Sequence, residues 1–153
     1  MENEKIVILL VCIFLAISSM ANLVAADANP DVVLLCENVV HIDEDTFYIE
    51  RIYVPGVSVY SNMRTGSKEV QYVYRGNLVF PLSVTGQFMY DGSSARATAA
   101  SGDIIWHVSN VSLNSKNAYT SGASAIASAS VSYLGTTLNK TVTLTCDANG
   151  NLS

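Results

Sequence analysis

The 153-residue chain is poor in basic residues, in histidine and in cysteine, and each shortage excludes a class of function. Eight Lys and Arg stand against thirteen Asp and Glu, so we expect no basic face and no nucleic-acid partner. The two histidines and three cysteines lack close ligand spacing, so we expect no metal and no other cofactor. Ser and Thr are abundant, but the absence of a Gly-x-Ser-x-Gly motif disfavours a serine hydrolase.

The first 26 residues contain the long apolar run of the chain, Ile6–Ile17. A short polar start precedes this run, and small residues follow it before Asp27. This order predicts a signal peptide over residues 1–26 and a secreted, extracellular or cell-surface protein. The alternative is an uncleaved anchor, because Ile6–Ala26 is long enough to cross a membrane. Only in that case do we expect the membrane to be a partner.

Residues 27–153 are expected to form one domain that is large enough to bury its own core. Residues 1–26 hold one of the eight Lys and Arg and two of the thirteen Asp and Glu, so the remainder carries seven against eleven, a net charge of −4. This mild acidity favours solubility.

The domain is predicted to be all-β, because short β-rich segments alternate with Gly, Pro and Asn turns and helical periodicity is lacking. Residues 62–68 and 109–117 are predicted as polar loops. We expect an antiparallel β-sandwich of about eight strands, with a closed β-barrel as the alternative. The predicted strands are 32–42, 46–54, 57–60, 69–75, 78–90, 95–99, 104–108, 123–133 and 141–146.

Three features of these strands predict how they pack. Pro81 has no ladder donor, which indicates that its strand runs along a sheet edge at that point. Gly86 lies on the apolar face of the same strand and indicates a bulge or bend. The alternation of Ala and Ser in 123–133 suits a sheet that lies close over another.

Cys36 and Cys146 lie in the first and last predicted strands. Secretion would place them in an oxidising compartment, so we expect a disulfide between them. The alternative is a pair of free thiols.

Two polar clusters are candidate calcium sites, because carboxylate and amide oxygens suit that ion. The second lacks the closing Glu of a calcium loop, and both are typical of solvated turns, which we favour. The clusters are His41, Asp43, Glu44 and Asp45, and Asp147, Asn149, Gly150 and Asn151.

Trp106 and His107 are a candidate ligand platform, since Trp106 is the only tryptophan of the chain. However, Ile104 and Val108 share its face at a period of two. This spacing favours a Trp106 buried between the sheets, with His107 pointing outward.

The C-terminal two-thirds of residues 27–153 contains an ordered set of short motifs. They are the strand with Phe88 and Tyr90, the Asp91–Gly92 turn, Trp106, the Ala/Ser-rich segment 121–129 and Cys146. In this order, residues 69–153 resemble a group of small secreted proteins of Gram-positive, clostridia-like bacteria. The resemblance implies a secreted β-domain and supplies no activity and no catalytic residue. Ala97 stands where that family often has a cysteine, which leaves the partner of Cys146 open.

We therefore expect a non-catalytic, secreted or cell-surface β-sandwich that binds a cell-surface or extracellular polymer or belongs to the envelope. The alternative is a small secreted hydrolase or effector that acts on cell-wall polymers. The enzyme hypothesis requires Trp106 and the acidic cluster at 41–45 to share one cleft with perturbed carboxylates. A structural envelope component would require exposed, self-complementary edge strands.

Overall fold

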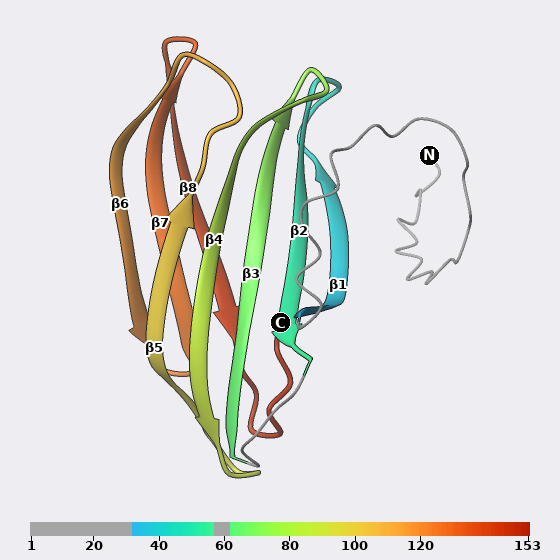
Figure 1. The fold of residues 1–153 in the computed structure, drawn as a ribbon, viewed down its shortest axis with the longest axis vertical. Helices are drawn as coiled ribbons and strands as arrows, with labels where there is room; N and C mark the ends of the chain where they lie inside the picture. Colours follow the sequence, from blue (N-terminus) through green and yellow to red (C-terminus); the bar gives the residue numbers. More distant parts are fainter. Residues whose placement is uncertain (1–31, 57–61) are drawn as a thin grey trace, which may run out of the picture.

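A computed structural model describes residues 32–56 and 62–153, which form two antiparallel β-sheets packed face to face (Figure 1). The predicted sandwich is confirmed, and the sheets are not closed into a barrel. The predicted signal segment 1–26 and the predicted strand 57–60 lie outside the described residues. The strands are β1 (Val32–His41), β2 (Thr46–Pro55), β3 (Met63–Tyr74), β4 (Asn77–Tyr90), β5 (Ala95–Ile104), β6 (Val111–Ser121), β7 (Ser124–Tyr133) and β8 (Thr136–Thr145).

The two sheets differ in width. The first has the order β1-β2-β3-β4-β5 and the second the order β6-β7-β8, and both are meanders of successive hairpins. The second sheet packs on β3, β4 and β5, whereas β1 and β2 extend beyond it. Figure 1 shows these two strands at the side of the molecule away from β6 and β7. One margin of the wider sheet is therefore left without a facing sheet.

The core lies between β4 and the two strands β7 and β8. Alternate residues of each strand point inward, as the period of two predicted, and are buried. The fully buried side chains include Phe80, Leu82, Val84, Phe88, Ala125, Ala127, Val131, Val142 and Leu144.

Small residues bring the sheets together, as predicted for the Ala/Ser strand. A Cβ atom on Gly86 would lie 2.7 Å from the Cβ of Ala125, and one on Gly102 would lie 2.8 Å from the Cβ of Ala127. Gly86 pairs regularly with Gly66, and the nearby register shift falls between Gln87 and Phe88 instead. Gly86 is thus required for close sheet packing, and the bulge expected there is absent.

Two predicted loops are strands. Residues 63–68 belong to β3, where β4 pairs with the whole segment and β2 pairs with Ser67 and Lys68. Residues 111–117 belong to β6, an edge strand whose side chains are mostly exposed. Polar side chains are compatible with both segments because neighbouring strands, and not burial, satisfy their backbone groups.

Pro81 lies in β4, an inner strand and not an edge strand. The last residue pair between β4 and β5 at this end is Leu82 with Ile104, and Pro81 is the next residue of β4 beyond that pair. Beyond that point the amide of Ile105 donates to the Pro81 carbonyl oxygen at 3.4 Å. The proline is accommodated because the ladder has ended at its position.

Candidate functional site

The acidic cluster at 41–45 forms the turn between β1 and β2. The Asp43 carboxylate accepts the amide of Asp45 at 2.9 Å, and the Asp45 carboxylate accepts Nε of Arg75 at 3.1 Å. The His41 ring packs on the Phe47 ring, with centroids 5.6 Å apart. The Asp43 carboxylate therefore contacts its own turn, and the Asp45 carboxylate ties this turn to Arg75 in the turn between β3 and β4.

The second acidic candidate also closes on itself. The Asp147 carboxylate accepts the amides of Asn149 and Asn151 at 2.8 and 2.9 Å and the side-chain amide of Asn151 at 2.8 Å. The side-chain hydrogen bond from Asn151, followed by the backbone amides, lowers the pKa of Asp147. Across residues 32–56 and 62–153, no three His, Cys, Asp or Glu side chains gather closely enough to share a metal ion.

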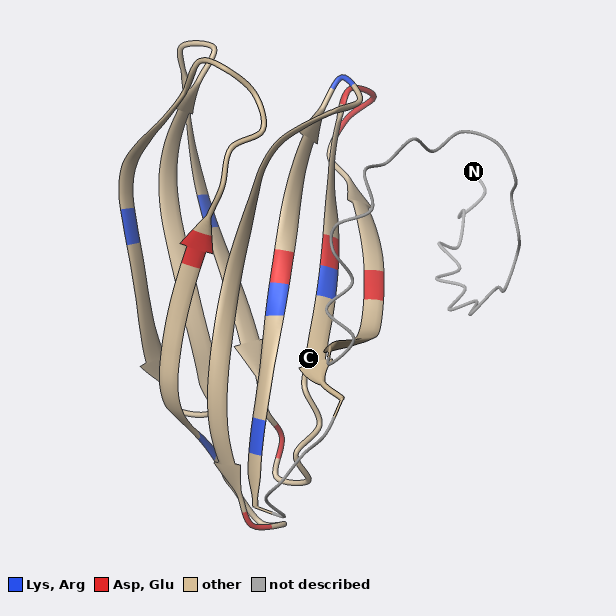
Figure 2. Cartoon of the chain, in the orientation of Figure 1, with Lys and Arg blue, Asp and Glu red and all other residues tan. Residues whose placement is uncertain are grey.

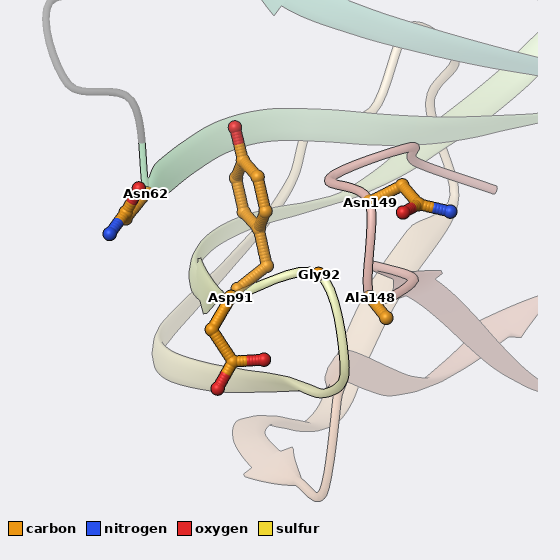
Figure 3. A pocket seen from close by; sticks show the side chains of 6 residues that line it. Asn62, Asp91, Gly92, Ala148 and Asn149 are labelled. Carbon is orange, nitrogen blue, oxygen red and sulfur yellow. The ribbon is translucent and has the colours of Figure 1, made fainter.

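A hollow of about 280 Å³ lies where the β4–β5 turn meets the C-terminal loop. Figure 3 shows Asn62 and Asn149 on opposite sides of it, with Asp91 and Gly92 between them. The Gly92 amide donates to the Ala148 carbonyl oxygen at 2.8 Å, which ties the two loops together.

The Asp91 carboxylate at this hollow is held in its ionised form. The hydroxyl and amide of Ser93, and then the amide of Ser94, donate to it and lower its pKa from 3.8 to about 2. A general acid needs a raised pKa, so Asp91 is unsuited to that role near neutral pH. The residues that line the hollow supply amides, a carboxylate and the phenol of Tyr90, but no paired nucleophile and base.

Trp106 is not buried in the core, contrary to the prediction from spacing. Its side chain is 44% exposed, and Ile105 beside it is 54% exposed. Residues 105–107 leave the strand after β5 ends, and the His107 amide donates to the Val79 carbonyl oxygen at 3.1 Å. The period of two therefore stops at Ile104, and the Trp106 ring lies at the surface with His107 also exposed.

The expected catalytic elements do not share one cleft. Trp106 follows a segment that runs beside β4, while the acidic turn joins β1 and β2. The strands β3 and β4 lie between Trp106 and the acidic turn. Since neighbouring strands are about 4.8 Å apart, Trp106 and the turn are on the order of 10–15 Å apart across the sheet. The hollow lies at the other end of β4, about 35 Å along the strand from Val79 at 3.3 Å per residue. The arrangement that would favour a hydrolase is not found among these described groups.

The predicted disulfide between Cys36 and Cys146 is absent, since both cysteines are free. Cys36 is exposed on β1. It pairs with Ile52 on β2, and Ile52 pairs with Lys68 on β3. Cys146 is buried after β8 and lies near Arg64. Cys36 on β1 and the neighbourhood of Arg64 on β3 are two strand spacings apart, which amounts to about 10 Å. This separation exceeds the roughly 7 Å between Cα atoms that a disulfide spans. Burial raises the pKa of the Cys146 thiol.

The most unusual surface of the described chain is β1 together with the residue that follows it. All ten residues of β1 are exposed, on both faces of the strand. Seven large apolar side chains gather here, each between 40 and 55% exposed. We call this set the β1 surface; it comprises Val32, Val33, Leu34, Leu35, Val39, Val40 and Ile42. Contiguous exposed apolar surface of this kind marks sites of association with proteins or membranes.

The single charged residue of β1 is neutralised within the chain. Glu37 lies opposite Arg51, which lies opposite Glu69, so that charges cross the first three strands at one level (Figure 2). Nε of Arg51 donates to Oε2 of Glu37 at 2.6 Å. Burial alone would lower the pKa of Arg51, but its hydrogen bond and charge pairing with Glu37 raise it. The strand therefore presents little net charge.

The inner face of β2 is partly closed by side chains of this same chain. Nζ of Lys140 lies 4.1 Å from the centre of the Tyr48 ring, and burial lowers the pKa of Lys140. On the neighbouring strand β3, Leu152, which bridges to Cys146, packs directly on Gly66. The uncovered surface is thus concentrated on β1 and not between the sheets.

No helix that could cross a membrane occurs in the part of the chain that the structure describes. Comparison of this chain with protein-family models, with curated proteins and with solved structures found no match.

Proposed function

We propose that this chain is a non-catalytic β-sandwich, secreted or held at the cell surface, that acts by binding a protein component of the envelope. The β1 surface carries the proposal, because seven half-exposed apolar side chains, six on β1 and Ile42 directly after it, are unfavourable unless a partner covers them. The signal-like order of residues 1–26 supports export.

The proposal assigns binding to β1 and not to the hollow at Asp91. The Asp91 carboxylate already accepts hydrogen bonds from Ser93 and Ser94, so it has little capacity left for a ligand. The apolar side chains of β1 instead favour a protein over a carbohydrate, whose hydroxyl groups would need polar partners.

Binding to Gram-positive cell envelopes tests this function. The purified protein is incubated with envelopes that have or have not been treated with protease, and the pelleted fraction is measured. We expect wild type in the pellet with untreated envelopes, and loss of binding after protease treatment. The same supernatants are assayed for soluble muropeptides, whose release would identify the chain as a cell-wall hydrolase instead.

Val39→Lys and Tyr119→Lys are a matched pair of variants for this assay. Val39 on β1 and Tyr119 on β6 are each 46% exposed and lie on edge strands of different sheets. We expect V39K to lose binding and Y119K to bind like wild type. Equal binding by the two variants, or wild type that stays in the supernatant, would contradict the proposal.

A further inference from the structure

We propose that the partner of the β1 surface is a second copy of this chain, whose β1 pairs antiparallel with the first. The two five-stranded sheets then become one continuous sheet. This inference rests on the proposed function, because it names the envelope protein that β1 binds as a copy of this chain already held there.

β1 lacks most of the devices that prevent edge strands from pairing. It is ten residues long and contains no Lys and no Pro, and its one carboxylate is neutralised by Arg51. One device is present, a register shift between Leu34 and Cys36. From Cys36 to His41 the pairing with β2 is regular, which leaves six consecutive residues with a regular free edge.

The charges at the turn that follows β1 select the antiparallel direction. A parallel pair would place the turn residues Asp43, Glu44 and Asp45 of both copies side by side. An antiparallel pair places these two acidic turns at opposite ends of the shared strands. Like charges directly opposite each other are destabilising, so the antiparallel arrangement is favoured.

One antiparallel register of the two β1 strands places a carboxylate opposite an imidazole. With Val39 on the twofold axis, Glu37 of each copy lies opposite His41 of the other, and Asn38 lies opposite Val40. Glu37, Val39 and His41 share one face of β1, because alternate residues of a strand do. Arg51 contacts Oε2 of Glu37, so Oε1 can accept a hydrogen bond from the second copy.

The size of this contact predicts reversible association. A strand pair of this length, with apolar side chains on both faces, buries on the order of 1,000 Å² in total, which is at the lower limit of a specific interface. We therefore expect dimers that form at micromolar concentration. A strand inserted against the inner face of β2 would instead have to displace Lys140 from the Tyr48 ring.

Disulfide trapping of Val39→Cys tests the pairing. The variant also carries Cys12→Ser and Cys36→Ser, and the buried Cys146 is left in place. Opposed residues in antiparallel strands are about 4.5–5.5 Å apart, within disulfide reach. On mild oxidation we expect V39C to form a covalent dimer at least about tenfold faster than Y119C in the same background, because pairing raises the local thiol concentration. Equal rates, or no dimer from V39C, would overturn the proposal.

Asn38→Cys in the same background tests the register. In the proposed register residue 38 of one copy lies opposite residue 40 of the other and not opposite its own counterpart. N38C should therefore crosslink more slowly than V39C. Crosslinking of N38C at the same rate or faster would overturn this register and would also be the result of parallel pairing. These measurements use purified protein alone, so their failure is distinguishable from failure of envelope binding.

Discussion

Replacing Gly86 with alanine adds one methyl group where the two sheets lie closest. The new Cβ would lie 2.6 Å from Cζ of Phe88 and 2.7 Å from the Cβ of Ala125. Both neighbours are fully buried, so neither side chain can move into solvent. The methyl group must therefore separate the sheets or force the Phe88 ring out of its position.

Two effects of this substitution oppose each other. Gly86 does not have a left-handed backbone, so alanine reduces the entropy of the unfolded chain and stabilises the fold by about 0.4–1 kcal/mol. Overpacking of a close-packed core destabilises by about 1–3 kcal/mol. The steric effect dominates, and we expect a net loss of about 1–2 kcal/mol, or roughly 3–10 °C in Tm for a domain of this size.

Urea unfolding of G86A, A125G and the double variant measures this effect. In the double variant the contact with Ala125 is relieved while the contact with Phe88 remains, so we expect partial recovery and a coupling free energy of at least about 0.5 kcal/mol. A G86A variant as stable as wild type would refute the inferred close approach of the sheets.

Three further predictions concern single residues. In a Cys12→Ser chain, whose remaining thiols are the exposed Cys36 and the buried, unbonded Cys146, a thiol reagent should modify one thiol in the native state and two in denaturant. No reactive thiol in denaturant would show that Cys36 and Cys146 are bonded to each other. The lowered pKa of Asp91 gives stability that is present above pH 3.8 and lost as the pH falls toward 2. Asp91→Asn should therefore flatten the dependence of the unfolding free energy on pH in this range, and an unchanged dependence would contradict this. Trp106→Phe should cost less than about 1 kcal/mol, as at other surface positions, and iodide should quench the native fluorescence; a loss of about 3 kcal/mol would instead indicate a core residue.

The fold class could be predicted because residues 82–88 of β4 and residues 127–133 of β7 alternate between apolar and polar residues. Buried strands carry this signal in their own side chains. β6 carries almost none, because an edge strand with both faces exposed can be polar throughout and is held by backbone pairing with β7. Its existence depends on a partner strand, which local pattern does not encode.

Trp106 and the cysteines were misplaced for a related reason. The spacing of Ile104 and Val108 assumed that the strand continued, whereas the chain leaves the sheet after Ile104. Cys36 and Cys146 are near the ends of the described chain, but the strand order places two strand spacings between their levels. Both predictions needed the order of strands in space.

The β1 surface could be predicted only in part. The absence of Lys and Pro and the apolar residues on both faces of 32–41 are visible in the sequence. The same pattern is typical of a central strand covered on both sides. Only the topology, with β1 at the edge of the wider sheet, establishes that these side chains are exposed.

Sedimentation velocity of the purified protein over a range of concentrations tests most directly whether β1 is the surface through which this chain associates. We expect the mass of the wild type to rise from one copy toward two in the micromolar range. V39K should remain monomeric, and Y119K should follow the wild type. A wild type that stays monomeric throughout, or a V39K variant that associates equally well, would contradict association through β1.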